Sequence, residues 1–336
     1  RAFYCAGKLI KNLSALMFAV IMALSLGGCA GTAPAAGDAS AAAKTDFKIG
    51  IIQLTQHAAL DQACKGFQET LQQLAKDSGC AVAFDVQNAS GEQSNCATIA
   101  TKFVNDGVDL ILAIATPAAQ AAVQATASIP ILITAVTDPE SAGLVDSNAA
   151  PGGNVSGTSD MNPVDKQAKL LQTLVPDVKT VGIMYCSAED NSILQADLAK
   201  TAFEALGMKV VIATAADSNE IQPVTTKMCG EVDAIYIPTD NAFAAAMPTV
   251  AMVANPAKIP VICGEQSMTE AGGLATYSID YYNLGKMTAQ QAFDILVKGA
   301  DISTMPIGMM DEADLSLYIN EETAAELGIT IPSDLK

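Results

Sequence analysis

Short β-branched, apolar runs alternate with segments of helical periodicity along most of this chain, and the whole pattern occurs twice. Strands are predicted at residues 48–53, 82–87, 110–115 and 131–136, and then at residues 180–186, 209–213, 234–238 and 260–264. Between them, apolar residues such as Phe67, Leu71 and Leu74 recur on one helix face, as the crossover of a βαβ unit requires. The sequence therefore predicts an α/β protein with two doubly wound, parallel-sheet lobes.

Two further extended segments, residues 154–160 and 273–280, are predicted to leave one lobe and enter the other. We expect the first lobe to contain residues 47–157 plus 280–302, and the second to contain residues 158–279 plus 303–336. Several crossover segments favour a hinge rather than a loose linker. A cleft between two α/β lobes is a usual ligand site, and it closes by hinge motion.

The first residues have the order of a bacterial export signal. Lys8 and Lys11 precede an apolar run over residues 13–26, which is shorter than the roughly 20 residues of a membrane span. The sequence Leu26-Gly27-Gly28-Cys29 is similar to a lipobox, so we expect a signal peptide at residues 1–28 and a lipidated Cys29. Residues 29–46 are rich in small residues and predict a flexible tether. The mature protein is then extracytoplasmic and lipid-anchored to the bacterial cell membrane.

Composition excludes several classes of function. The formal net charge of -18 argues against a nucleic-acid partner, which requires many Lys and Arg contacts to phosphates. Arg1 is the sole arginine and lies in the predicted signal, so no guanidinium is left to hold phosphate or dicarboxylate ligands. His57 is the sole histidine, and no GxSxG, P-loop or strand-linked GxGxxG motif is present. We therefore predict a protein that is not an enzyme and uses no metal or cofactor.

Six cysteines remain once the leader and Cys29 are set aside, and none has CxxC spacing. Several lie on predicted core elements, where cysteine behaves as a small hydrophobic residue. We expect mostly free thiols at Cys64, Cys80, Cys96, Cys186, Cys229 and Cys263.

The loops after the predicted strands should line the cleft, because ligands of open α/β sheets bind beyond the carboxyl ends of the strands. Thr116-Pro117, Asp138-Pro139 and Asn162-Pro163 each have the residue types of a helix start, whose free N–H groups can hold a carboxylate. The same loops carry many acids and almost no lysine, which favours a cationic group on the ligand. Together these features predict a zwitterion. The acids are Asp61, Asp138, Asp160, Glu189, Asp190, Asp240, Glu265 and Asp280, and the aromatic candidates for an apolar wall are Tyr185, Tyr236, Phe243, Tyr277, Tyr281 and Tyr282.

Several motifs in this order match one family of transport proteins. They are Gln53, His57-Ala58-Ala59-Leu60-Asp61, Ala115-Thr116-Pro117-Ala118-Ala119-Gln120, Thr137-Asp138-Pro139, Gly157-Thr158-Ser159-Asp160, Ser187-Ala188-Glu189-Asp190-Asn191-Ser192, Pro238-Thr239-Asp240-Asn241 and Gly272-Gly273-Leu274-Ala275. From residue 47 onward, the chain resembles the tryptophan/tyrosine-type ABC transporter substrate-binding proteins. The resemblance implies a type I periplasmic-binding fold, an amino-acid site between the lobes, and ABC permease and ATPase partners. We expect the protein itself to be a monomer.

By their positions in these motifs, nine residues are expected to contact the ligand. We assign Asp160 and Asp240 to the ligand's amine, Thr116 and Thr137 to its carboxylate, and Gln53 and Tyr185 to its side chain. The full set is Gln53, Thr116, Thr137, Ser159, Asp160, Tyr185, Asn191, Asp240 and Asn241.

Two kinds of alternative stay open at this point. The same architecture could bind a nucleoside, a polyamine or another amine. It could also be a sensor that reports ligand occupancy to a signalling partner, because fold alone does not fix function. A polyamine would need carboxylates at both ends of its site, which distinguishes it from an amino acid.

Overall fold

The computed structural model describes residues 44–335. The predicted signal peptide at residues 1–28, the lipidation of Cys29 and most of the predicted tether lie outside the described residues. Within residues 44–335, no helix is both long enough and apolar enough to cross a bilayer.

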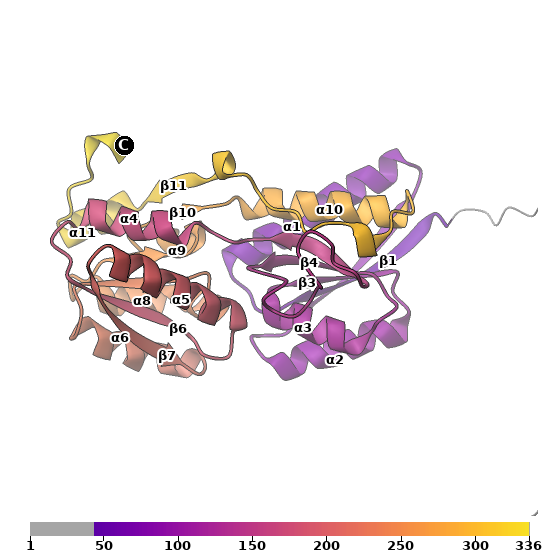
Figure 1. The fold of residues 1–336 in the computed structure, drawn as a ribbon. Coiled ribbons are helices and arrows are strands. Elements are labelled where there is room, and N and C mark those ends of the chain that lie inside the picture. The colour runs from indigo at the N-terminus through magenta and orange to yellow at the C-terminus, as the bar shows by residue number, and fades with distance from the viewer. Residues whose placement is uncertain (1–43, 336) are drawn as a thin grey trace, which may run out of the picture. The chain divides into compact units, whose positions relative to one another are not determined.

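The first lobe is a five-stranded parallel sheet with helices on both faces (Figure 1). Its strand order is β2-β1-β3-β4-β5, with the helices α1 and α10 packed together on one face and α2 and α3 on the other. The strands are β1 (Asp46–Gln53), β2 (Ala81–Asn88), β3 (Leu110–Ile114), β4 (Ile131–Val136) and β5 (Val155–Ser159). The helices are α1 (Ala58–Asp77), α2 (Gln93–Asp106), α3 (Thr116–Ala125) and α10 (Tyr281–Leu296).

The second lobe is a six-stranded sheet in the order β11-β10-β9-β8-β6-β7, and two apolar clusters cover its two faces. Residues of α4, α5 and α11 build one cluster, and residues of α6, α7, α8 and α9 build the other. The strands are β6 (Thr180–Cys186), β7 (Lys209–Ala215), β8 (Ala234–Ile237), β9 (Val261–Cys263), β10 (Ala275–Ser278) and β11 (Ser316–Ile319). The helices are α4 (Val164–Leu174), α5 (Asp190–Ala205), α6 (Ile221–Cys229), α7 (Asn241–Ala245), α8 (Met247–Ala254), α9 (Gln266–Glu270) and α11 (Glu321–Leu327).

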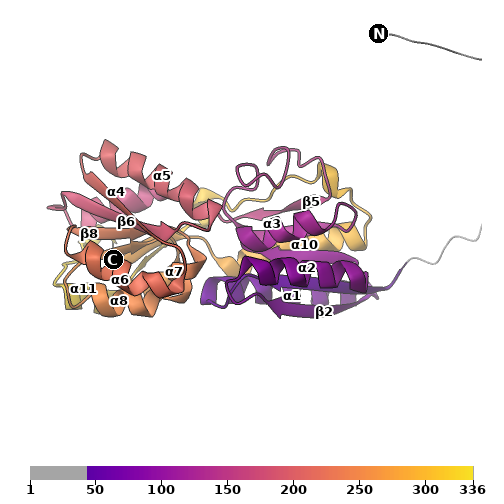
Figure 2. The ribbon, with the colours of Figure 1, turned by 90° about the horizontal axis from the view of Figure 1, so that it is seen from below.

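The predicted fold class is confirmed, since both sheets consist mainly of parallel strands, most of them joined by helical crossovers (Figure 2). One feature was not anticipated. The edge strand β11 pairs antiparallel with β10, so the second sheet is mixed.

Helix α10 returns from the second lobe to pack against α1 of the first, and two glycines allow the close contact. A Cβ atom at Gly66 would lie 2.1 Å from the carbonyl oxygen of Tyr282, and one at Gly285 would lie 2.0 Å from that of Ala63. Any side chain at either position would force the two helix backbones apart. The chain thus crosses between the lobes after β5, before α10 and again before β11.

Residues 303–310 lie with the first lobe, although the sequence led us to expect them in the second. Ile307 is buried in the first lobe's core, and its N–H donates to the carbonyl of Asn148 at 2.8 Å. The N–H of Ser159 donates to the carbonyl of Gly308 at 2.8 Å. The segment after α10 therefore runs along the edge strand β5 before it crosses to β11.

The loop after β4 differs from the predicted helix start. The register between β4 and β5 shifts between Ile133 and Val136, and Ala135 has a φ of 53° in the left-handed region. Asp138 then accepts hydrogen bonds from the Ser141 hydroxyl at 2.6 Å and the Asn148 amide at 2.9 Å. These bonds close a turn, so no helix follows Asp138-Pro139. Helices do begin at or just after the other two predicted starts, as α3 and α4.

Candidate ligand-binding site

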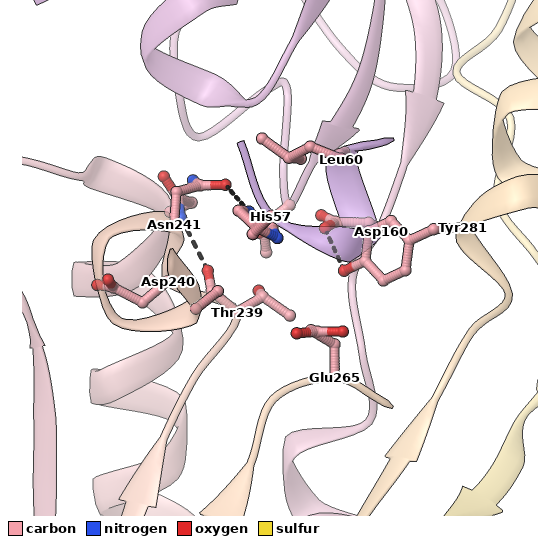
Figure 3. Close-up of a pocket in the computed structure, with 12 residues that line it drawn as sticks. His57, Leu60, Asp160, Thr239, Asp240, Asn241, Glu265 and Tyr281 are labelled. Carbon is pink, nitrogen blue, oxygen red and sulfur yellow. Dashed lines mark hydrogen bonds between the residues drawn. The ribbon is translucent and has the colours of Figure 1, made fainter. Parts of the chain in front are cut away.

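A small cavity of about 10 Å³ lies between the two lobes (Figure 3). This is room for about one water molecule, so a ligand of amino-acid size needs the lining side chains or the lobes to move apart. The first lobe and the adjoining crossover segments contribute His57, Leu60, Ala135, Thr137, Asp160 and Tyr281. The second lobe contributes Asn191, Thr239, Asp240, Asn241, Ala244 and Glu265.

Five of the nine residues predicted to contact a ligand line this cavity: Thr137, Asp160, Asn191, Asp240 and Asn241. Each follows a strand at the carboxyl edge of its sheet, where the prediction placed it.

The other four predicted contacts lie elsewhere. Gln53 is buried and donates to the Asp61 carboxylate at 2.7 Å. The Ser159 hydroxyl donates to the Thr137 carbonyl at 2.6 Å, so it supports the loop rather than facing the cavity. The Thr116 hydroxyl is buried without a partner and borders an adjoining groove. Tyr185 packs on the second lobe's core and does not line the cavity.

Asp160 is the acid of the cavity that has one carboxylate oxygen without a hydrogen-bond partner among the described residues. Its side chain is 4% exposed, and Oδ2 accepts a hydrogen bond from the Tyr281 hydroxyl at 2.8 Å. Oδ1 is buried and has no partner within the described residues. Burial raises the pKa of this carboxyl, and the nearby hydroxyls of Tyr281 and Thr137 oppose that shift only in part. A cation placed at Oδ1 would remove the cost of burying the charge.

The other buried acids near the cavity are occupied by backbone groups. Asp240 accepts from the N–H groups of Cys186 at 2.6 Å and Phe243 at 2.8 Å. Glu265 caps α9 by accepting from the N–H groups of Ser267 and Met268. Asp240 and Glu265 therefore hold helix starts in place, and neither leaves an oxygen without a partner.

Glu189 lies beside the cavity and has the same capping role. Its carboxylate accepts from the N–H groups of Asn241 and Ala242 at 3.2 and 3.0 Å. Burial and the neighbouring charge of Asp240 raise the pKa of Glu189 to about 8. Burial likewise raises the pKa of Asp240 and of Glu265. The site is thus acidic, as the sequence indicated. Burial removes all of its carboxyl groups from water and so destabilises their charged forms.

The nine predicted contacts do not include four polar residues of the cavity wall, which are His57, Thr239, Glu265 and Tyr281. The chain's sole histidine lies just before α1, and Tyr281 is the first residue of α10. Both sit at helix starts next to a strand end, which was the signal that could have selected them. Of the six aromatic residues proposed for an apolar wall, Tyr281 alone lines this cavity, while Tyr236 and Phe243 are core residues.

Hydrogen bonds between side chains tie the lobes together around the cavity. The Gln195 amide donates to Thr137 Oγ1 at 3.2 Å, and the Gln120 amide donates to Asp190 at 2.8 Å. His57 Nε2 lies 3.1 Å from Asn241 Oδ1. These contacts join α3 and the loops of the first lobe to α5 and α7 of the second. The two lobes are therefore in a closed arrangement.

Two wound lobes closed over a buried polar cavity define a solute receptor of the type I periplasmic-binding class. The sequence model of the family described as ABC transporter substrate binding protein matches residues 48–336. The chain belongs to this family, whose members are extracytoplasmic solute binders and not enzymes.

Relatives in the family make the similarity specific. The chain is 40% identical over 326 residues to a tyrosine-binding protein of Clostridioides difficile strain R20291, covering 94% of this chain and 92% of that one. It is also similar to a crystal structure from Streptococcus pneumoniae of an ABC domain in complex with L-Trp. That match has 39% identity and a TM-score of 0.82, and covers 86% of this chain and 97% of the other.

A third relative indicates the conformation. The ligand-free, open structure of a substrate-binding protein with adhesive properties from Clostridium difficile is 43% identical, with coverage of 86% of this chain and 97% of that one. Its TM-score of 0.64 is nevertheless lower than the 0.82 of the L-Trp complex. The present arrangement of the lobes is therefore nearer to the ligand-bound relative than to the open one.

Proposed function

We propose that this protein captures an aromatic amino acid between its lobes and delivers it to the permease and ATPase of an ABC importer. The observation that carries the proposal is the unpartnered Oδ1 of Asp160 in an enclosed cavity. A cationic partner stabilises the charged form of a buried carboxylate that lacks a donor at one oxygen, and a ligand ammonium supplies both the charge and the N–H donors.

The chemistry of the cavity favours an amino acid over a polyamine. A polyamine needs a free carboxylate at each end, but Asp240, Glu189 and Glu265 already accept from backbone N–H groups. The one further unpartnered carbonyl oxygen of the cavity wall is Oδ1 of Asn191, which carries no charge. Asp160 and Asn191 together can satisfy a single ammonium.

Thr137 is suited to the other half of a zwitterion. Its Oγ1 accepts from the Gln195 amide, and its hydroxyl proton can be donated to a ligand carboxylate when it turns away from the nearby Asp160 carboxyl, whose pKa it lowers. Thr116, the second residue that we assigned to the carboxylate, borders the adjoining groove and retains an unpartnered hydroxyl. We keep Thr137 as the principal donor from the first lobe.

An aromatic side chain is supported by the wall and by the relatives. Leu60, Ala135 and Ala244 give the cavity apolar surface, and Tyr281 adds a ring. One relative is described as binding tyrosine and another was crystallised with L-Trp. An aromatic amino acid would use both the apolar wall and the Asp160 end.

The decisive experiment is a thermal-shift screen followed by titration calorimetry on protein that begins at Ala30 and contains the whole compact unit Lys44–Lys336. A ligand that binds the folded state raises the melting temperature by mass action. Stabilisation by Tyr, Trp or Phe supports the proposal. A response only to nucleosides or polyamines would refute the choice of ligand.

We also propose that Cys29 carries a lipid that holds the receptor at the membrane beside its permease. The support is the lipobox-like sequence and the tether behind it. In cells, the Cys29→Ala variant should lose incorporation of radiolabelled palmitate and leave the membrane fraction. Retention of both label and location in this variant would exclude the anchor.

A further inference from the structure

His57 lies at the interface between the two lobes. It precedes α1 of the first lobe, and its Nε2 lies 3.1 Å from Oδ1 of Asn241 on α7 of the second. Its other ring nitrogen, Nδ1, is buried and has no partner within residues 44–335. Figure 3 shows the imidazole between Asn241 and Asp160, in the wall of the cavity.

A chain of hydrogen bonds fixes which nitrogen of His57 carries the proton. Glu189 Oε2 accepts from the side-chain amide nitrogen of Asn241 at 2.5 Å and from the Asn241 backbone N–H at 3.2 Å. The amide nitrogen of Asn241 therefore faces Glu189, and its oxygen faces the imidazole. Because an amide oxygen only accepts, Nε2 of His57 must donate.

Burial favours the neutral ring, in which Nδ1 is an acceptor. Burial lowers the pKa of His57, against smaller opposing contributions from the Asn241 hydrogen bond and the charge of Asp61. With the proton on Nε2, Nδ1 presents a lone pair for which residues 44–335 offer no donor.

The surroundings of Nδ1 indicate what kind of donor it takes. Leu60 lies three residues after His57, and Ala244 three residues after Asn241, so apolar groups of the cavity wall accompany both partners. An ammonium would gain more from the charged oxygen of Asp160 than from a neutral ring nitrogen. A neutral acceptor among apolar groups therefore suits the N–H or O–H group of an aromatic side chain.

We propose that the Glu189–Asn241–His57 chain presents His57 Nδ1 as the acceptor for an N–H or O–H group on the ligand's side chain, and that it selects tyrosine or tryptophan over phenylalanine. The inference rests on the proposed function, since it takes the cavity to hold an aromatic amino acid. The contact between His57 and Asn241 also depends on closure of the two lobes, because Asn241 lies on the opposite lobe.

Calorimetry with L-Tyr, L-Trp and L-Phe tests the selection. The unaltered protein should bind Tyr or Trp at least about tenfold more tightly than Phe, because a site built for a donor is left with an unpaired acceptor when the donor is missing. In His57→Leu, the ratio to Phe should fall to within about threefold, a free-energy difference well below the 1.4 kcal/mol of a tenfold ratio. An unaltered ratio in this variant, or no preference over Phe in the unaltered protein, would overturn the inference.

Asp160→Asn separates this inference from the proposed function. It should weaken all three amino acids alike and keep their ratios, because the ammonium is common to them. If none of the three binds the unaltered protein, the proposed function fails. If all three bind equally, the proposed function stands and the role of His57 fails.

A spectroscopic measurement needs no variant. Because His57 is the sole histidine, ¹⁵N-histidine labelling gives one pair of imidazole signals. In the complex with Tyr or Trp, Nε2 should be protonated, and the Nδ1 signal should shift towards that of a hydrogen-bonded acceptor; with Phe the second change should be absent. A proton on Nδ1 would contradict the proposed orientation of the chain.

Discussion

Replacement of Asp160 by Asn should change ligand affinity and ligand-free stability in opposite directions. The carboxyl is 4% exposed, and one of its oxygens accepts from Tyr281 while the other has no partner. Asn has nearly the same shape and keeps an oxygen for the Tyr281 hydroxyl. The substitution therefore removes a charge with little change of packing.

The loss of affinity follows from the enclosure of the cavity. The ligand's ammonium would remain buried without a counter-ion, and removing one partner of a buried charge pair costs about 2–5 kcal/mol. The lower value corresponds to a roughly 30-fold increase in Kd. Calorimetry of Asp160→Asn with the best ligand of the screen measures this change, and Asp177→Asn, which removes an exposed carboxylate by the same substitution, is the matched control.

The gain of ligand-free stability has a defined dependence on pH. Burial raises the folded-state pKa of Asp160 above its ordinary 3.8, so the folded protein holds the proton more tightly than the unfolded chain does. Stability is therefore full below the unfolded pKa and falls as the pH rises through the interval up to the folded pKa. Glu189, with a pKa raised to about 8, extends the same decline upward.

Melting curves of the ligand-free protein from about pH 4 to about pH 8 test the sign. The unaltered protein should lose stability as the pH rises, and Asp160→Asn should lose less, ending with the higher melting temperature near pH 8. A lower melting temperature for the variant at that pH, or an unchanged Kd, would show that Asp160 has a ligand-independent partner and refute the reasoning.

Three further predictions concern the scaffold. Gly285→Ala should cost about 1–3 kcal/mol, at the upper end because its Cβ would meet the backbone of Ala63, and urea unfolding measures the loss. Tyr236→Phe should cost about 1–3 kcal/mol in the same assay, because the Oε1 of Gln167 that accepts from Tyr236 would stay buried without a donor. The Cys263 thiol, fully buried and with its pKa raised by burial, should resist Ellman's reagent until the protein is unfolded.

Matched controls exist for each. Gly153→Ala places a Cβ in open space and should leave the unfolding midpoint in place. Tyr318→Phe removes a hydroxyl from a half-buried edge-strand residue and should cost well under 1 kcal/mol, about what surface substitutions cost. Cys80 is half-buried and should react in the folded state. Equal losses in variant and control, or fewer than six reactive thiols in the unfolded mature chain, would contradict the corresponding prediction.

Strands were predictable because their signal is local. The runs at residues 131–136 and 180–186 have the bounds of β4 and β6, since β-branched residues and flanking turns mark both ends. A local signal of this kind could not assign residues 303–310 to the first lobe. They belong to it because Ile307 is buried in the first lobe's core and because the segment forms backbone hydrogen bonds to β5. Neither contact leaves a periodic pattern in the sequence.

The site was predictable as far as the loops after the strands, whereas Tyr185, a residue of a strand, was wrongly expected in it. Met184 and Tyr185 are neighbours on β6 and point to opposite sides of the sheet, where each joins a different apolar cluster. Neither side chain lines the cavity, because its wall is built from the segments that follow the strands. His57 was not among the predicted contacts, because its partner Asn241 comes from the opposite lobe and the pair forms only when the lobes close.

The packing of α10 on α1 sets the order in which the protein can fold during synthesis. The first lobe is encoded first, yet one of its four helices follows nearly the whole second lobe in the chain. Until residue 296 has left the ribosome, the exposed face of α1 around Gly66 has no partner, and the N-terminal lobe cannot reach its final stability. A nascent chain built this way stays unfolded for longer, a property that suits a polypeptide threaded through a membrane before it folds.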